Sequence, residues 1–155
     1  MESSSALAEL AFEQSQRRLD KQERVVEELR ARTAILLVAS SLAASFLGKE
    51  AFGGSGWDVL AVVAAVAFLV TMLSAVYVLL PRKRLVFSLI GSALYEQLYG
   101  LAAEEVHRRL SYDLDRFWEE NDLEIARLRQ GVQVAASGLI IEVLALVGLV
   151  ADTIT

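Results

Sequence analysis

The chain has 155 residues, of which 55% are hydrophobic and 23% are charged, with a net charge of −5, one proline and no cysteine. Thirty of the 35 charged residues fall in 1–32 and 82–129, and the other 75 residues carry only five. A bilayer imposes such segregation because its hydrocarbon tolerates few charges over a span of about 20 residues. The composition therefore argues against a soluble enzyme domain and against nucleic acid as a partner, and it excludes disulfides and thiolate metal sites.

Residues 1–32 predict a cytoplasmic amphipathic helix. Phe12, Leu19 and Val26 are spaced by seven, but the partner positions include Ser15 and Gln22, so the coiled-coil signal is weak. A solvated helix that leans on the rest of the protein is the favoured interpretation. The opening letters MESSSALAEL lack the basic flank and apolar core of a signal peptide, and we expect an internal segment to direct insertion.

Residues 33–48 carry no charge over 16 positions and predict the first transmembrane helix. The run is short of a full span, although the preceding arginines can extend their side chains to the membrane surface. Ser40, Ser41 and Ser45 belong to a face of small residues that lets helices approach closely in lipid. The same face could line a water-filled path, and packing is the favoured alternative.

Residues 59–81 are free of charge over 23 positions and predict the second transmembrane helix. Together with 33–48 they form a predicted transmembrane hairpin over 33–81, closed by a Gly-rich turn within 49–58. Pro81 ends the second helix, and a basic cluster follows at once.

Residues 82–130 predict a second cytoplasmic helical region, apolar early and charge-rich from 101 onward. Segment 85–99 is too short for another crossing, and it is expected on the membrane surface or against the bundle. Asn121 with Glu124 fits a capping box that would restart the helix there. An unbroken helix running into the membrane is the alternative.

Residues 131–151 predict the third transmembrane helix, in which Glu142 is the sole charge over 21 positions. An ionisable group at this depth faces a bundle interior, a partner or water. Three interpretations of Glu142 remain open. Its carboxyl group is protonated and bonds to hydroxyls of the first transmembrane helix, it pairs with a group of another subunit, or it lines a conducting path. Gln133, nine residues earlier, lies half a turn out of phase, so the two cannot form one narrow stripe. Both are candidate pore or subunit-contact residues, with Ser40, Ser41 and Ser45.

Lys and Arg gather on one side of these spans, which predicts a cytoplasmic N-terminus and an outside C-terminus. The expected fold class is all-α: an integral membrane helical bundle with three transmembrane helices and a cytoplasmic layer of long helices. The chain contains no phosphate loop, HExxH or nucleophile elbow. We therefore expect no catalytic residue, no cofactor and no metal site, and a protein that is not an enzyme.

One set of cytoplasmic residues combines guanidinium groups for a phosphate with aromatic surface for a base or a partner protein. Its members are Arg108, Arg109, Arg116, Tyr112 and Trp118. An ordinary solvated helix face is the competing and favoured interpretation.

The stretches ELRARTAILLVASSLAASFLG (28–48) and IARLRQGVQVAASGLIIEVLALVGL (125–149), in this order of elements, resemble small bacterial membrane effectors of anti-phage defence. The families are the Pycsar transmembrane effectors and the related SLATT-type effectors. The resemblance implies a homo-oligomer in the bacterial inner (plasma) membrane that permeabilises or depolarises it when a cyclic nucleotide or another cue is present. This chain has no recognisable nucleotide-binding module, which leaves indirect activation open. The alternative function is a non-conducting scaffold or adaptor that recruits a cytoplasmic partner protein.

Overall fold

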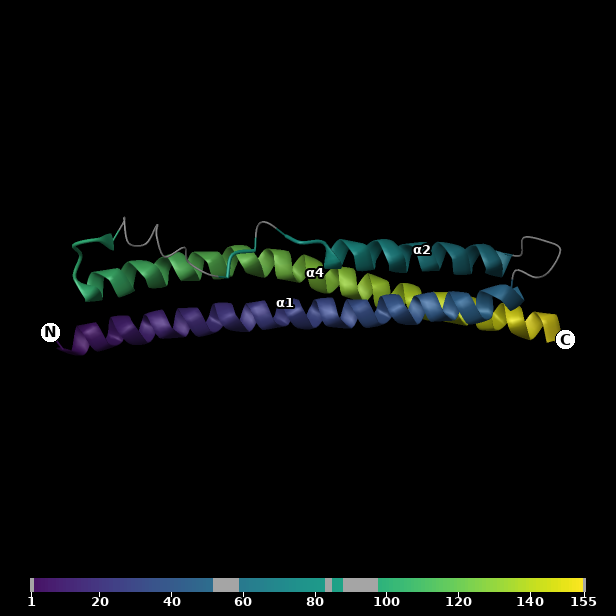
Figure 1. The fold of residues 1–155 in the computed structure, drawn as a ribbon, viewed down its shortest axis with the longest axis horizontal. Coiled ribbons are helices and arrows are strands. Elements are labelled where there is room, and N and C mark those ends of the chain that lie inside the picture. The colour runs from purple at the N-terminus through teal and green to yellow at the C-terminus, as the bar shows by residue number, and fades with distance from the viewer. Residues whose placement is uncertain (1, 52–58, 83–84, 88–97, 155) are drawn as a thin grey trace. The chain divides into compact units, whose positions relative to one another are not determined.

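The chain folds into α-helices in the computed structural model, which describes residues 2–51, 59–82, 85–87 and 98–154. The helices are α1 (Glu2–Ala51), α2 (Val59–Leu79) and α4 (Ala103–Ile154), in the order drawn in Figure 1. No strand occurs in these ranges, so the all-helical prediction is confirmed. The predicted Gly-rich turn, from 52 onward, and most of 85–99 lie outside the described residues.

The helix bounds follow from composition and from two backbone positions. α1 and α4 contain no proline and are rich in Ala, Leu, Glu and Arg, which have high helix propensity. α2 ends at Leu79 because Pro81 disfavours helical geometry at the residue before it. Gly100, with φ of 85°, occupies the left-handed region in the turn that precedes α4, where a side chain would be strained.

Both long helices continue through boundaries that the sequence pattern suggested. α1 includes the predicted cytoplasmic segment and the uncharged run after it, and α4 includes the charged region and the last apolar run. The restart at Asn121 is wrong, because α4 passes through this residue and its side chain bonds elsewhere.

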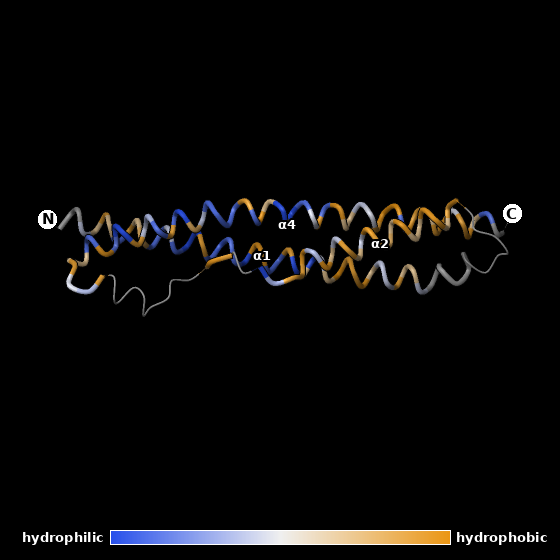
Figure 2. The backbone as a smooth tube through the Cα atoms, turned by 90° about the horizontal axis from the view of Figure 1, so that it is seen from above, coloured by the Kyte–Doolittle hydropathy of each residue, from blue (hydrophilic) through white to orange (hydrophobic). Residues whose placement is uncertain are grey.

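The residues group into two compact units, and both long helices contribute to each. Unit 1 contains 1–27 and 82–126, and unit 2 contains 28–81 and 127–155. Figure 2 shows the contrast in hydropathy, since α2 and the last part of α4 are mainly hydrophobic whereas the first parts of α1 and α4 are mainly hydrophilic.

In unit 1 the first part of α1 packs against the first part of α4, and the two run parallel. Ser15 Oγ donates to Asp115 Oδ1 at 3.1 Å, and Gln22 Nε2 donates to the carbonyl of Trp118 at 3.0 Å. Buried apolar side chains fill the space between the two helices: Leu19, Val26, Leu110, Leu114 and Ile125. The rings of Phe12 and His107 stack at 5.3 Å, which places the single histidine in a packed contact.

In unit 2, α2 runs antiparallel to the last part of α4 and approaches it closely. A Cβ atom on Gly131 would lie 2.7 Å from Val78 Cγ2, and one on Gly148 would lie 3.4 Å from Leu60 Cδ1. Ala43 of α1 packs against a small apolar cluster: Ala61, Ala64, Ala145, Leu146 and Leu149. Small residues at these contacts allow the backbones to come together, as helices do in lipid.

The number of candidate membrane spans is two among the described residues, not the predicted three. α2 and the apolar part of α4 are long and apolar enough to cross a bilayer, and the 33–48 segment of α1 does not qualify. Its uncharged run is only 16 residues long and carries several hydroxyl groups, which lower its hydropathy. The length and hydropathy of this segment are therefore insufficient to identify α1 as a membrane-spanning helix.

Candidate functional site

Seven-residue spacing determines which side chains of the two long helices are buried. Residues seven apart lie nearly on one face of an α-helix, as in coiled coils. On α1 the buried members of this series are Leu19, Val26, Thr33 and Ser40. On α4 they are Leu114, Asn121, Leu128, Ala135, Glu142 and Leu149. Glu142 and Ser40 therefore occupy core positions of a regular repeat.

Glu142 is the central polar residue of unit 2. It is 1% exposed, and Ser40, also 1% exposed, donates a hydrogen bond from Oγ to Glu142 Oε2 at 2.6 Å. The other carboxylate oxygen, Oε1, is buried and has no hydrogen-bond partner in the described part of the chain. The carboxyl group thus binds a hydroxyl of the 33–48 segment within one chain and retains acceptor capacity.

A second polar contact lies between α2 and α4. Thr71 is fully buried, and its hydroxyl lies 3.0 Å from the carbonyl of Ala67 and 3.4 Å from that of Ala135. A Cβ atom on Gly138 would collide with this hydroxyl and would lie 3.3 Å from the carbonyl oxygen of Ala67. Gly138 is therefore required by the close approach of the two helices.

The outer surface of unit 2 is largely apolar. Large apolar side chains are exposed on all three helices, including Ile35 at 67%, Leu73 at 68% and Leu144 at 66%. The buried faces carry alanines and some larger apolar side chains, such as Leu146, together with Ser40, Thr71 and Glu142. An apolar outer surface of this extent suits a helical bundle surrounded by lipid.

The remaining predicted contact residues of unit 2 lie apart from Glu142. Ser41 is exposed, and its hydroxyl donates to the carbonyl of Leu37 in its own helix at 2.8 Å. Ser45 is exposed as well, so of the three serines only Ser40 reaches the carboxylate. Gln133 lines an apolar groove of about 660 Å³ between α2 and α4, on a different face of α4 from Glu142.

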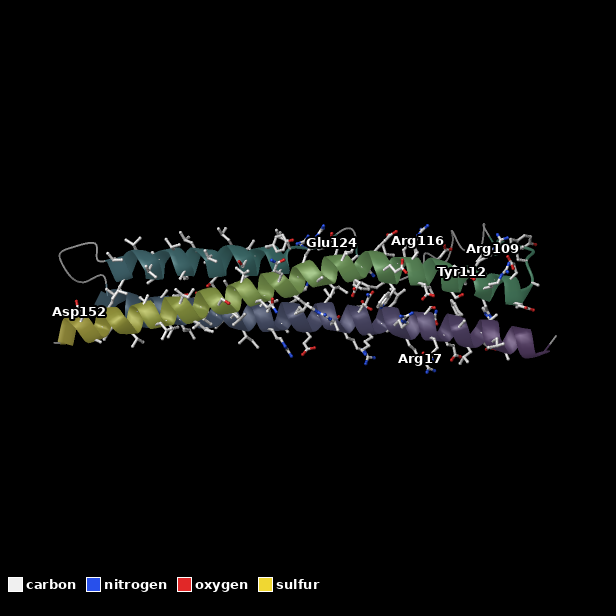
Figure 3. The ribbon with its side chains drawn as sticks, turned by 180° about the vertical axis from the view of Figure 1, so that it is seen from behind. Arg17, Arg109, Tyr112, Arg116, Glu124 and Asp152 are labelled. Atoms are coloured by element: carbon white, nitrogen blue, oxygen red, sulfur yellow. The ribbon has the colours of Figure 1, made fainter. Side chains whose placement is uncertain are left out.

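In unit 1, four residues of the predicted ligand surface are exposed on α4: Arg108, Arg109, Tyr112 and Arg116. Figure 3 labels Arg109, Tyr112 and Arg116, which follow one another along α4. Arg108 and Arg109 both pair with Glu105, at 2.6 and 2.7 Å, and Arg116 lies 3.7 Å from Glu120. The hydrogen bond from Arg109 and the charge of Arg108 lower the pKa of the Glu105 carboxyl.

Trp118 contacts two polar residues of α1. The Arg18 guanidinium lies 4.5 Å from the centroid of its ring, in a cation–π contact, and its carbonyl accepts the bond from Gln22. Trp118 is therefore held against α1 through its ring and through its backbone.

Among the polar contacts of α4 that were not predicted are those of Glu124 and Asn121. Arg82 donates to Glu124 at 3.1 Å, with side chains that are 21% and 9% exposed. Asn121 binds the backbone of Val86 twice, accepting from its N–H at 3.1 Å and donating to its carbonyl at 2.8 Å. The seven-residue spacing from Leu114 to Asn121 and Leu128 was the available signal, since it marks Asn121 as an inward position.

The described residues hold no group of three or more His, Cys, Asp or Glu side chains that could bind a metal ion. No protein-family model matches the chain, and neither a curated protein nor a solved structure matches it.

Proposed function

We propose that this protein is an inner-membrane protein of bacteria that assembles as a homo-oligomer and depolarises the membrane when its cytoplasmic helices are triggered. The observation that carries the proposal is the Glu142 carboxyl group, buried with Ser40 inside a unit whose outer surface is apolar. Such a group is costly in hydrocarbon and commonly marks an ion pathway or a helix contact.

The distribution of side chains supports the membrane location. Only 28% of the most apolar stretch of α2 and 33% of that of α4 is buried inside the chain, whereas the core helix of a soluble protein is mostly buried. Exposed Ile35, Val38 and Leu42 extend the apolar surface onto α1. A surrounding lipid bilayer would shield all of these apolar side chains from water.

The contacts of α1 support its passage through the membrane beside the two spans, although its own hydropathy is insufficient. In unit 1, residues before Glu28 bind residues after Pro81, so both belong to one aqueous side. The basic residues make that side the cytoplasm. In unit 2, Ser40 and Ala43 pack on α2 and α4 through small side chains and a hydrogen bond.

Conduction is proposed because the carboxyl group is incompletely bonded. Glu142 Oε1 lacks a partner among the described residues, so it can bind water or a cation when neighbouring chains open a path. The proposed trigger is based on the resemblance to anti-phage effectors. It is a cyclic nucleotide or a cytoplasmic partner protein that acts on unit 1.

Ion flux into liposomes tests this function. Full-length protein is reconstituted into phosphatidylethanolamine and phosphatidylglycerol vesicles, and a potential-sensitive dye reports flux with and without added cyclic nucleotides. We expect flux in the wild type and a reduction of about tenfold, or ~1.4 kcal/mol on the barrier, in Glu142→Gln. The amide preserves the size and can accept the bond from Ser40, so this variant separates the carboxylate from packing.

The matched control is Glu119→Gln, which removes an exposed carboxylate of unit 1 and should leave flux unchanged. Oligomer size in detergent is measured for each variant. Equal flux in wild type and Glu142→Gln would exclude the carboxylate from the path. Wild-type vesicles that stay tight with and without cyclic nucleotides would exclude spontaneous and nucleotide-triggered conduction.

Tight vesicles would favour the second candidate, a membrane scaffold or adaptor. The observation in its favour is Tyr112, which is 73% exposed between Arg108 and Arg116 on α4. Exposed tyrosine flanked by arginine is typical of protein contact surfaces.

A further inference from the structure

Two hollows between α2 and α4 adjoin each other on the surface of unit 2. Their volumes are about 660 and 360 Å³, and both are lined by Gln130 and Val134. Each volume lies within the range of small-molecule sites, about 300–1,000 Å³. A groove that joins them can hold an elongated ligand.

The larger hollow is apolar and lies within the candidate spans. Its walls come from the middle of α2 and from the apolar part of α4: Val62, Val63, Val66, Val70, Val134 and Ile141. Most of these side chains are themselves about half exposed, so the hollow opens outward from unit 2. A hydrocarbon chain matches its chemistry.

The smaller hollow has a mixed lining that includes polar side chains and one arginine, and it lies where the spans end. It is lined by Arg127, Tyr77, Ser74 and Gln130, next to the end of α2 at Leu79. Tyrosine concentrates at membrane interfaces, and a guanidinium group binds phosphate through several hydrogen bonds. Basic pockets between spans on the cytoplasmic side suit anionic lipid head groups.

We propose that this groove binds one anionic phospholipid of the cytoplasmic leaflet, with its phosphate at Arg127 and an acyl chain beside Val66, Val70 and Ile141. The inference rests on the proposed membrane location. Along α4 the groove extends from 127 to 141, about 21 Å at 1.5 Å per residue. That length matches half of a ~30 Å hydrocarbon core plus part of the head-group region.

A second copy of the chain is a poorer occupant. Copies in one membrane share an orientation, so two grooves facing each other would place Arg127 opposite Arg127 at the same depth. Like charges placed together across an interface are unfavourable. A phospholipid offers phosphate oxygens to the hydrogen-bond donors at this end and hydrocarbon at the other.

Lipid binding to the purified full chain tests the proposal. Native mass spectrometry compares titrations with phosphatidylglycerol and phosphatidylcholine in detergent. We expect one phosphatidylglycerol per chain, bound about fivefold more tightly than phosphatidylcholine. Arg127→Gln should abolish this preference and leave phosphatidylcholine binding unchanged, whereas Arg129→Gln, which lines neither hollow, should retain it.

Val66→Trp should weaken both lipids, because the indole ring fills the apolar hollow, and far-UV circular dichroism checks that this variant folds. Equal binding of the two lipids by the wild type, or an unchanged preference in Arg127→Gln, would overturn the proposal. Full displacement of phosphatidylglycerol by millimolar inorganic phosphate would assign the site to free phosphate instead.

Extraction of membranes with alkaline carbonate separates this inference from the proposed function. A chain that resists extraction but shows no lipid preference leaves the membrane location intact and refutes the lipid site. A chain that is extracted refutes the membrane location itself.

Discussion

The pair of Ser40 and Glu142 sits where a coiled coil would place apolar side chains. Each occupies a position seven residues from other buried members of its helix, such as Thr33 on α1 and Ala135 on α4. A polar pair at such positions fixes the register of two helices, because sliding one helix would leave the hydroxyl and carboxyl groups unpaired. The contact therefore specifies the alignment of α1 and α4 within unit 2.

Gly138 offers a residue-scale test of the packing of α2 on α4. In Gly138→Ala the new methyl group meets the hydroxyl of buried Thr71 and the backbone carbonyl of Ala67, which cannot rotate away. Overpacking of this kind costs about 1–3 kcal/mol. We expect a loss of that size in the free energy of unfolding, measured by circular dichroism in mixed micelles with increasing SDS.

Gly148→Ala is the matched control, because its methyl group would make an ordinary contact with Leu60 Cδ1 at 3.4 Å. Alanine favours helix over glycine by up to about 1 kcal/mol, so this variant should be neutral or stabilised. Equal destabilisation of both variants would show that the tight contact at Gly138 does not form.

At the scale of elements, the segment after α2 is attached to α4 by two polar contacts. Arg82 pairs with Glu124, and the backbone of Val86 bonds to the side chain of Asn121 in both directions. The Asn121 side-chain amide bonds to the N–H and the carbonyl of Val86, as a neighbouring backbone would in a helix or strand. Asn121 thus holds an irregular segment on a helix.

Arg82→Leu should destabilise unit 1, because it removes the 3.1 Å partner of a Glu124 side chain that is only 9% exposed. A buried pair that loses one member costs about 3–5 kcal/mol, and the partial exposure of Arg82 reduces this to ~1–3 kcal/mol. Denaturant unfolding is followed by Trp118 fluorescence in a Trp57→Phe background, since the chain has two tryptophans.

The control at this scale is Arg17→Leu, which breaks an exposed pair with Glu13 whose side chains are 68% and 48% exposed. A pair of this type contributes about 0–1 kcal/mol. A loss in Arg82→Leu no greater than in Arg17→Leu would contradict the anchoring role of Arg82.

For the whole molecule, the absence of cysteine permits a direct test of topology. Single cysteines at Glu9, Glu119 and Asp152, all exposed, are probed with an impermeant maleimide on intact cells. The basic-residue bias predicts that the first two lie in the cytoplasm and the third outside. We expect Asp152→Cys to react at once, and Glu9→Cys and Glu119→Cys only after the membrane is permeabilised.

Glu9→Cys decides whether α1 accompanies the two spans. Labelling of this residue from outside, together with protection of Glu119→Cys, would mean that only α2 and α4 cross the membrane. It would also contradict the contacts that join Ser15 and Gln22 to α4 in unit 1.

The sequence by itself determined the helical class, the separation of charged and apolar regions, two apolar spans and the exceptional charge of Glu142. These features are local, because helix propensity and the length of an uncharged run depend only on neighbouring residues. The same local rule misjudged residues 33–48, whose short run does not qualify as a span.

Only the tertiary structure decided which polar groups meet. It selected Ser40 from three candidate serines, joined Asn121 to Val86 and turned Trp118 toward Arg18. The physical reason is that partner choice depends on which face each helix buries and on the alignment of residues about 100 positions apart in the chain. Neither quantity is contained in any single stretch of sequence.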